Sequence, residues 1–208
     1  MASRDPFGRG RVRRLFGLDR SAPPPRQTRK GEPLRPWTIP NAVGYLRLAA
    51  LPVFLVLAYG TDDGTSVLSA MVFWAIAAGD YLDGILARVT GQYSRLGALL
   101  DPLVDRLTIL AGAVVCWNFE LLPRWALAVL AVREVVTLLL AQLYLRRVGE
   151  LEINWLGRIA IWPTMAAIFF AMISESWVWD TMLIVGVVLG ILGTVAYIRT
   201  GIRQLATA

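Results

Sequence analysis

The chain has 208 residues, of which 56% are hydrophobic, with a mean hydropathy of +0.56 and a formal net charge of +6. This composition is too apolar for an ordinary soluble domain, and the length allows several membrane spans of about 20 residues each. The single cysteine, Cys116, excludes an intrachain disulfide, and its apolar neighbours predict a buried core residue. Because the chain has no histidine, His-ligated zinc and catalysis by a histidine base are excluded.

The positive charge is concentrated in an N-terminal arm. Residues 1–36 hold 10 Lys and Arg against 3 Asp and Glu, whereas the rest of the chain is nearly neutral. The arm is rich in Pro, Gly and Arg, which predicts a disordered basic segment over residues 1–35. We expect it to act as a topology signal or to attract anionic lipid head groups. Nucleic acid is not expected as a partner, because no aromatic platform accompanies the arginines.

Six apolar segments follow the arm, and each is long enough for a membrane-spanning helix. They lie near residues 41–59, 67–88, 95–116, 122–146, 155–173 and 179–199. The sequence therefore predicts an all-α, polytopic membrane protein with six transmembrane helices. We expect one membrane domain over residues 36–203, followed by a short tail at 204–208.

The charges between these segments predict their orientation in the cell membrane. Acidic residues gather in the connections on one side: Asp62, Asp63, Glu120, Glu175 and Asp180. The other side holds the arm and six arginines: Arg88, Arg95, Arg146, Arg147, Arg199 and Arg203. Since cytoplasmic loops carry an excess of bases, both termini are expected in the cytoplasm.

Four aspartates stand out in the second and third segments. Asp80 and Asp83 lie toward the end of one segment, and Asp101 and Asp105 toward the start of the next. An ionisable group costs about 2.5–3.5 kcal/mol at the centre of a membrane helix on insertion scales. The short linker TGQYS makes the two helices antiparallel neighbours, so the carboxylates are expected to converge. Hard divalent cations prefer such ligands, and the sequence predicts a metal site for two ions.

Small residues and an arginine accompany these acids. Gly84, Ala87 and Gly97 allow close approach of a helix or a ligand, and Arg88 can bind a phosphate. Two other interpretations stay open at this point. The acids could pair with arginines at a helix interface, with Arg88, Arg95 and Arg106 as partners, or they could belong to an ion channel or transporter.

Eight positions with fixed spacing form one pattern: Asp80-x2-Asp83-Gly84-x2-Ala87-Arg88-x8-Gly97-x3-Asp101-x3-Asp105. This pattern resembles, without a gap or substitution, the signature of the CDP-alcohol phosphatidyltransferases. The resemblance implies a six-helix membrane enzyme, a homodimer, with an active site facing the cytoplasm. It also implies Mg2+ or Mn2+ as cofactor and transfer of a phosphatidyl group from CDP-diacylglycerol to an alcohol, with release of CMP.

The resemblance also implies roles for individual residues. The four aspartates would be metal ligands, and Asp105 would also be the general base toward the acceptor hydroxyl. Gly84, Ala87 and Gly97 would form a tight pocket for cytidine and its phosphates, with Arg88 on the diphosphate and Ser94 near the nucleotide. Asn41 would touch the lipid phosphate, and Arg47 would be either a second contact or a helix-interface residue.

The acceptor is predicted from two further runs. TIPNAVGYLRLAALPVF and SRLGALLDPLVDR resemble the branch of the family that makes glycerol-based phospholipids. Phosphatidylglycerol, which would give cardiolipin, is favoured over glycerol 3-phosphate, the acceptor of phosphatidylglycerophosphate synthases, because few bases are available for a phosphomonoester. An inositol phosphate is a third possibility. Candidate acceptor-binding residues are Arg133, Arg146, Arg147 and Arg158, which could instead form an ion-pair network with Glu134.

Overall fold

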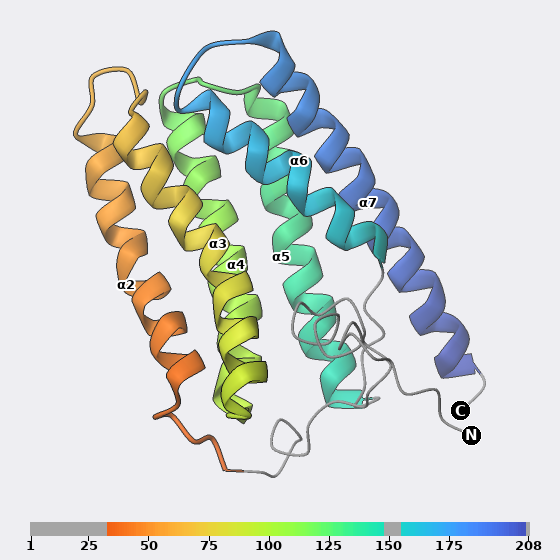
Figure 1. Ribbon diagram of the computed structural model, residues 1–208. Helices are drawn as coiled ribbons and strands as arrows, with labels where there is room; N and C mark the ends of the chain where they lie inside the picture. The colour runs from red at the N-terminus through yellow and green to blue at the C-terminus, as the bar shows by residue number, and fades with distance from the viewer. Residues whose placement is uncertain (1–32, 148–154, 207–208) are drawn as a thin grey trace, which may run out of the picture. The chain divides into compact units, whose positions relative to one another are not determined.

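A computed structural model describes residues 33–147 and 155–206 of the chain. Within these ranges the chain forms six α-helices and no strand (Figure 1). The helices are α2 (Ile39–Tyr59), α3 (Val67–Thr90), α4 (Arg95–Asn118), α5 (Arg124–Arg147), α6 (Trp155–Ala171) and α7 (Trp177–Ala206). The predicted all-α class is confirmed, and each predicted segment corresponds to one helix. Most of the predicted arm, residues 1–32, lies outside the described residues.

Three of these helices are long and apolar enough to cross a membrane. Among the described residues they are Ile39–Tyr59, Val67–Thr90 and Trp177–Ala196. Helix α6 has only 17 residues, and the first half of α4 carries Asp101, Asp105 and Arg106. The chain therefore has the helices of a membrane protein, and three of the six meet the requirements for a span by length and composition.

The chain divides into two compact units. Unit 1 comprises the described residues up to Val53 together with Ala75–Thr108, and unit 2 comprises Phe54–Trp74 and the residues from Ile109 onward. Unit 1 thus contains the first part of α2, the second part of α3 and the first part of α4. All four predicted metal ligands lie in unit 1.

Hydroxyl side chains begin two helices of unit 1. The backbone N–H of Asn41 donates to Thr38 Oγ1 at the start of α2, and that of Gly97 donates to Ser94 Oγ at the start of α4. Such caps satisfy N–H groups that have no partner inside the helix. The backbone N–H of Leu96 also donates to the Leu34 carbonyl at 3.2 Å. The entry to α2 and the entry to α4 are therefore joined at one end of unit 1 (Figure 1).

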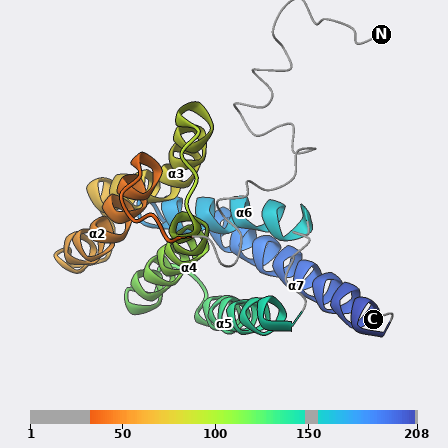
Figure 2. The same ribbon diagram turned by 90° about the horizontal axis from the view of Figure 1, so that it is seen from below.

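Unit 2 is held by apolar packing. Its core includes the fully buried side chains of Phe54, Phe73, Ile168 and Leu183, and Cys116 is buried as predicted. Helices α6 and α7 run side by side (Figures 1 and 2). Gly186 allows this approach, because a Cβ there would lie only 2.3 Å from Thr164 Oγ1.

Candidate active site

The four aspartates of the pattern converge within unit 1. Asp80, Asp83 and Asp101 interact electrostatically with one another, as Asp101 does with Asp105. Their exposure differs: the side chain of Asp80 is 50% exposed, that of Asp105 34% and that of Asp83 5%. The cluster therefore has an open side at Asp80 and a buried side at Asp83.

Arg47 of α2 lies among these acids. Its Nη1 donates to Asp83 Oδ2 at 3.1 Å, and its Nη2 donates to Asp105 Oδ1 at 2.6 Å. Nη1 also lies 3.7 Å from Asp80 Oδ1, and the arginine side chain is only 3% exposed. Since a buried charge is costly unless it is paired, these contacts stabilise both the guanidinium and the acids. Arg47 therefore joins α2, α3 and α4.

Gly79 makes room for this arginine. A Cβ at Gly79 would lie 2.6 Å from Cδ of Arg47, closer than carbon atoms can approach. The Arg47 Nε donates to the Ile76 carbonyl at 2.8 Å, three residues before Gly79. The side chain thus crosses α3 where that helix presents no side chain, and it reaches the carboxylates beyond.

The donor set of the cluster fits a hard divalent cation. Four carboxylates supply only oxygen ligands, which Mg2+ and Mn2+ prefer. Three of them already surround a cationic group, the guanidinium of Arg47. As positioned here, no three acidic or cysteine side chains in the described ranges enclose a common metal position. The four carboxylates are therefore the residues that would hold such an ion.

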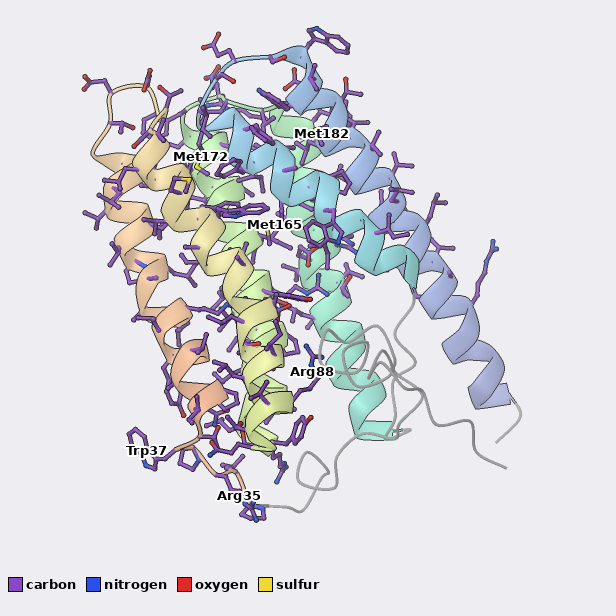
Figure 3. All side chains as sticks on the ribbon, viewed as in Figure 1. Arg35, Trp37, Arg88, Met165, Met172 and Met182 are labelled. Carbon is purple, nitrogen blue, oxygen red and sulfur yellow. The ribbon has the colours of Figure 1, made fainter. Side chains whose placement is uncertain are left out.

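Arg88 differs from Arg47 in its partners. It lies in the last turn of α3, near the end of unit 1 where the helix meets its linker (Figure 3). Its Nε is buried and has no hydrogen-bond partner in the described part of the chain. Its Nη2 would lie 3.3 Å from a Cβ at Gly84, so the guanidinium folds back along its own helix. Arg88 thus has one N–H donor without an acceptor among the described residues.

Asn41 and Ser94 form a buried pair beside Gly97. The Ser94 hydroxyl donates to Asn41 Oδ1 at 2.8 Å, and Asn41 Nδ2 donates to the carbonyls of Arg35 and Pro36. The two residues are 2% and 5% exposed, respectively. Both polar atoms of the Asn41 amide are therefore occupied by the protein. Ala87, the remaining small residue of the pattern, is partly exposed on α3.

The predicted acceptor-binding residues lie in unit 2. Arg133 Nη1 donates to Oε1 of the fully buried Glu134, while Arg133 Nε is buried without a partner among the described residues. The guanidinium lies against Gly190 of α7, where a Cβ would be 3.0 Å from Arg133 Cζ. The other three candidates, Arg146, Arg147 and Arg158, are on α5 and α6, and their side chains lie outside what the structure describes.

Sequence reasoning missed the pairing of Arg47 with the acids. It considered Arg88, Arg95 and Arg106 as their partners, because these bases lie close in sequence. Arg47 is 36 residues from Asp83 and 58 residues from Asp105. One signal was present: Arg47 is a charged residue near the middle of an apolar helix, and such a residue requires a partner. Gly79, next to Asp80, was a second signal.

Comparisons with known proteins identify the family of the chain. Residues 37–192 match the CDP-alcohol phosphatidyltransferase family. A Streptomyces coelicolor protein named cardiolipin synthase (CMP-forming) is 38% identical over 148 residues, which cover 68% of each chain. A Bacillus subtilis protein named CDP-diacylglycerol--glycerol-3-phosphate 3-phosphatidyltransferase is 28% identical over 145 residues, covering 64% of this chain and 75% of its own. The chain belongs to the CDP-alcohol phosphatidyltransferase family.

Proposed function

We propose that this chain is a metal-dependent enzyme that transfers the phosphatidyl group of CDP-diacylglycerol to a glycerol-based acceptor and releases CMP. The observation that carries this proposal is the cluster of four carboxylates around a buried guanidinium, with Arg88 and its unpaired Nε on the same helix as Asp80 and Asp83. The family supports the same chemistry. It gives no support to the channel or transporter interpretation.

Asp80, Asp83, Asp101 and Asp105 would hold the ions, proposed as two Mg2+ or Mn2+. When bound, these ions would neutralise the diphosphate and stabilise the charge on departing CMP. Arg88 binds a phosphate of the same diphosphate through its available donors. Gly84, Ala87 and Gly97 are proposed to leave room for the nucleotide, with Ser94 at its edge and Asn41 near the lipid phosphate.

In the transfer step, Asp105 accepts the proton of the acceptor hydroxyl. The acceptor oxygen forms a bond to the phosphatidyl phosphorus, and the bond from that phosphorus to CMP breaks with its electron pair leaving on CMP. Asp105 is one-third exposed, so an acceptor can reach it. Arg47 binds Oδ1 of Asp105 and so orients the carboxylate. No covalent intermediate with the protein is required.

The proposed acceptor is phosphatidylglycerol, which gives cardiolipin. The pairing of Arg133 with Glu134 supports this choice, because a neutralised arginine attracts a phosphomonoester less than a free one does. The 38% identical relative carries the cardiolipin synthase name. Glycerol 3-phosphate is the second candidate, since the Bacillus subtilis relative is named for that acceptor.

The test uses purified enzyme in lipid nanodiscs with CDP-diacylglycerol and one acceptor at a time. With phosphatidylglycerol we expect CMP release and a lipid product with the mass of cardiolipin in the mass spectrum. With glycerol 3-phosphate or inositol phosphate we expect little turnover. The reverse preference would identify a phosphatidylglycerophosphate synthase. EDTA should abolish turnover and Mg2+ or Mn2+ should restore it, whereas full activity after thorough chelation would refute metal dependence.

The membrane arrangement is part of the proposal. We place six spans in the cell membrane, residues 1–35 as a cytoplasmic arm and 204–208 as a cytoplasmic tail, with residues 36–203 as one domain that forms a homodimer. The acidic turn at Asp62 and Asp63 would then face the opposite side. Single cysteines introduced into a Cys116→Ser background test this arrangement. Labelling of Asp63→Cys by an impermeant reagent from the cytoplasmic side would contradict it.

A further inference from the structure

The environment of Arg47 resembles that of an ion in a carboxylate site. Its guanidinium contacts Asp83 and Asp105 directly, lies 3.7 Å from Asp80, and is almost completely buried. Every nitrogen has a defined position, since Nε donates to the Ile76 carbonyl and Gly79 gives space to the side-chain stem. We propose that Arg47 occupies a cation position within the aspartate cluster, where it holds Asp83 and Asp105 and competes with a divalent ion.

Electrostatics gives the reason for the competition. Without a positive charge, the clustered carboxylates would repel one another. Arg47 supplies one charge from within the protein, so the cluster keeps its arrangement before an ion binds. Arg47 donates to one oxygen each of Asp83 and Asp105, Oδ2 and Oδ1 respectively. A divalent ion bound by these carboxylates would draw on the same negative charge, and it would also meet the positive guanidinium at close range. We therefore expect ion binding to weaken at least one of the contacts of Arg47 with Asp83 and Asp105.

The hydrogen bond from Arg47 to the Ile76 carbonyl allows Arg47 to release an aspartate without leaving the site. It involves Nε, whereas the carboxylates use Nη1 and Nη2. The side chain can thus remain anchored on α3 while its terminal nitrogens release an aspartate. Arg47 is in this sense a positioning residue for the metal ligands, and its charge determines how tightly they bind the ion.

The test measures Mn2+ affinity of the full-length protein by electron paramagnetic resonance, so that turnover is not needed. Arg47→Gln should bind Mn2+ about tenfold more tightly than the wild type, which corresponds to about 1.4 kcal/mol. Its melting temperature should also rise more on addition of Mn2+, because the metal-free variant lacks the cation that holds the cluster. Arg124→Gln is the control, since that arginine is 50% exposed and pairs with Glu120. It should leave the affinity unchanged.

A second variant covers the case in which Arg47→Gln does not fold. Gly79→Ala keeps every charge, but its Cβ would displace the Arg47 side chain. It should also tighten Mn2+ binding. This inference rests on the metal dependence proposed above, and the two can fail separately. If the wild type binds Mn2+ and the variants bind it equally or more weakly, the competition is overturned and the metal dependence stands. If none of the proteins binds Mn2+, the competition and the metal dependence are both overturned.

Discussion

Asn41 and Gly97 are in direct contact: a Cβ at Gly97 would lie 2.7 Å from Asn41 Oδ1. The same oxygen accepts the Ser94 hydroxyl, and the amide nitrogen donates to carbonyls of the segment that precedes α2. The missing side chain at Gly97 therefore makes room for a residue of the protein itself. A contribution of Gly97 to the nucleotide pocket stays a prediction.

Gly97→Ala should destabilise the protein through Asn41. The added methyl displaces the amide from buried hydrogen bonds, which costs about 1–3 kcal/mol when a partner is left unsatisfied. In an Asn41→Ala background the closest neighbour is gone and only the Ser94 hydroxyl, 3.1 Å from the added carbon, remains near it. Adding Gly97→Ala should therefore cost clearly less there than in the wild type. Thermal denaturation of the four proteins measures this coupling. If Gly97 serves the nucleotide alone, stability would stay constant and the KM for CDP-diacylglycerol would rise in both backgrounds.

Asp105→Asn should stop the chemical step while CDP-diacylglycerol still binds. The amide retains an oxygen that can accept from Arg47 Nη2, but it cannot accept the proton of the acceptor. Loss of a general base typically lowers turnover about 10²- to 10⁴-fold. CMP release and a lipid-binding assay give the two readouts. Asp63→Asn, in the exposed loop before α3, is the control and should be fully active. Normal turnover by Asp105→Asn would show that this residue is not the base.

Arg88→Gln should leave the stability nearly unchanged, whereas Arg47→Gln should lower it. The Nε of Arg88 has no partner in the described ranges, so its removal should change the free energy of unfolding by less than about 0.5 kcal/mol. The kcat/KM of Arg88→Gln should fall, because the variant loses a contact with the phosphate. Each 1.4 kcal/mol of lost transition-state stabilisation lowers kcat/KM about tenfold.

Removing Arg47 leaves the buried Asp83 without its partner, and breaking a fully buried pair costs about 3–5 kcal/mol. The loss at Asp105 should be smaller because that side chain is one-third exposed. Melting temperatures and steady-state kinetics of both variants test the contrast. A larger loss of stability in Arg88→Gln than in Arg47→Gln would reverse these assignments.

Truncation of the arm should be tolerated up to residue 32 but not through residue 36. The carbonyls of Leu34, Arg35 and Pro36 accept hydrogen bonds from Leu96, Asn41 and Tyr45, which joins the entry segment to α2 and α4. A protein that begins after residue 32 keeps these acceptors and should retain its turnover and melting temperature. One that begins after residue 36 should melt at a lower temperature. Equal stability of the two proteins would show that these hydrogen bonds contribute nothing measurable.

The sequence alone determined the helices and the convergence of the four acids. Long apolar runs separated by polar turns predict helices without knowledge of their packing, and all six were found. Asp80 and Asp83 share a face through their spacing of three, as Asp101 and Asp105 do through their spacing of four. The short linker then brings the two helices together. These are local relationships, and local relationships follow from the chain itself.

Only the tertiary structure decided which residues pair with these acids and which side chains occupy the space beside the nearby glycines. Arg47 reaches Asp105 across 58 residues of sequence, and Ser94 reaches Asn41 across 53. Such contacts depend on how far each helix is rotated and shifted against its neighbours. A helix that is apolar on most of its surface carries little information about that rotation. The partners of buried polar groups, Arg47 above all, therefore became evident only when the helices of unit 1 were packed together.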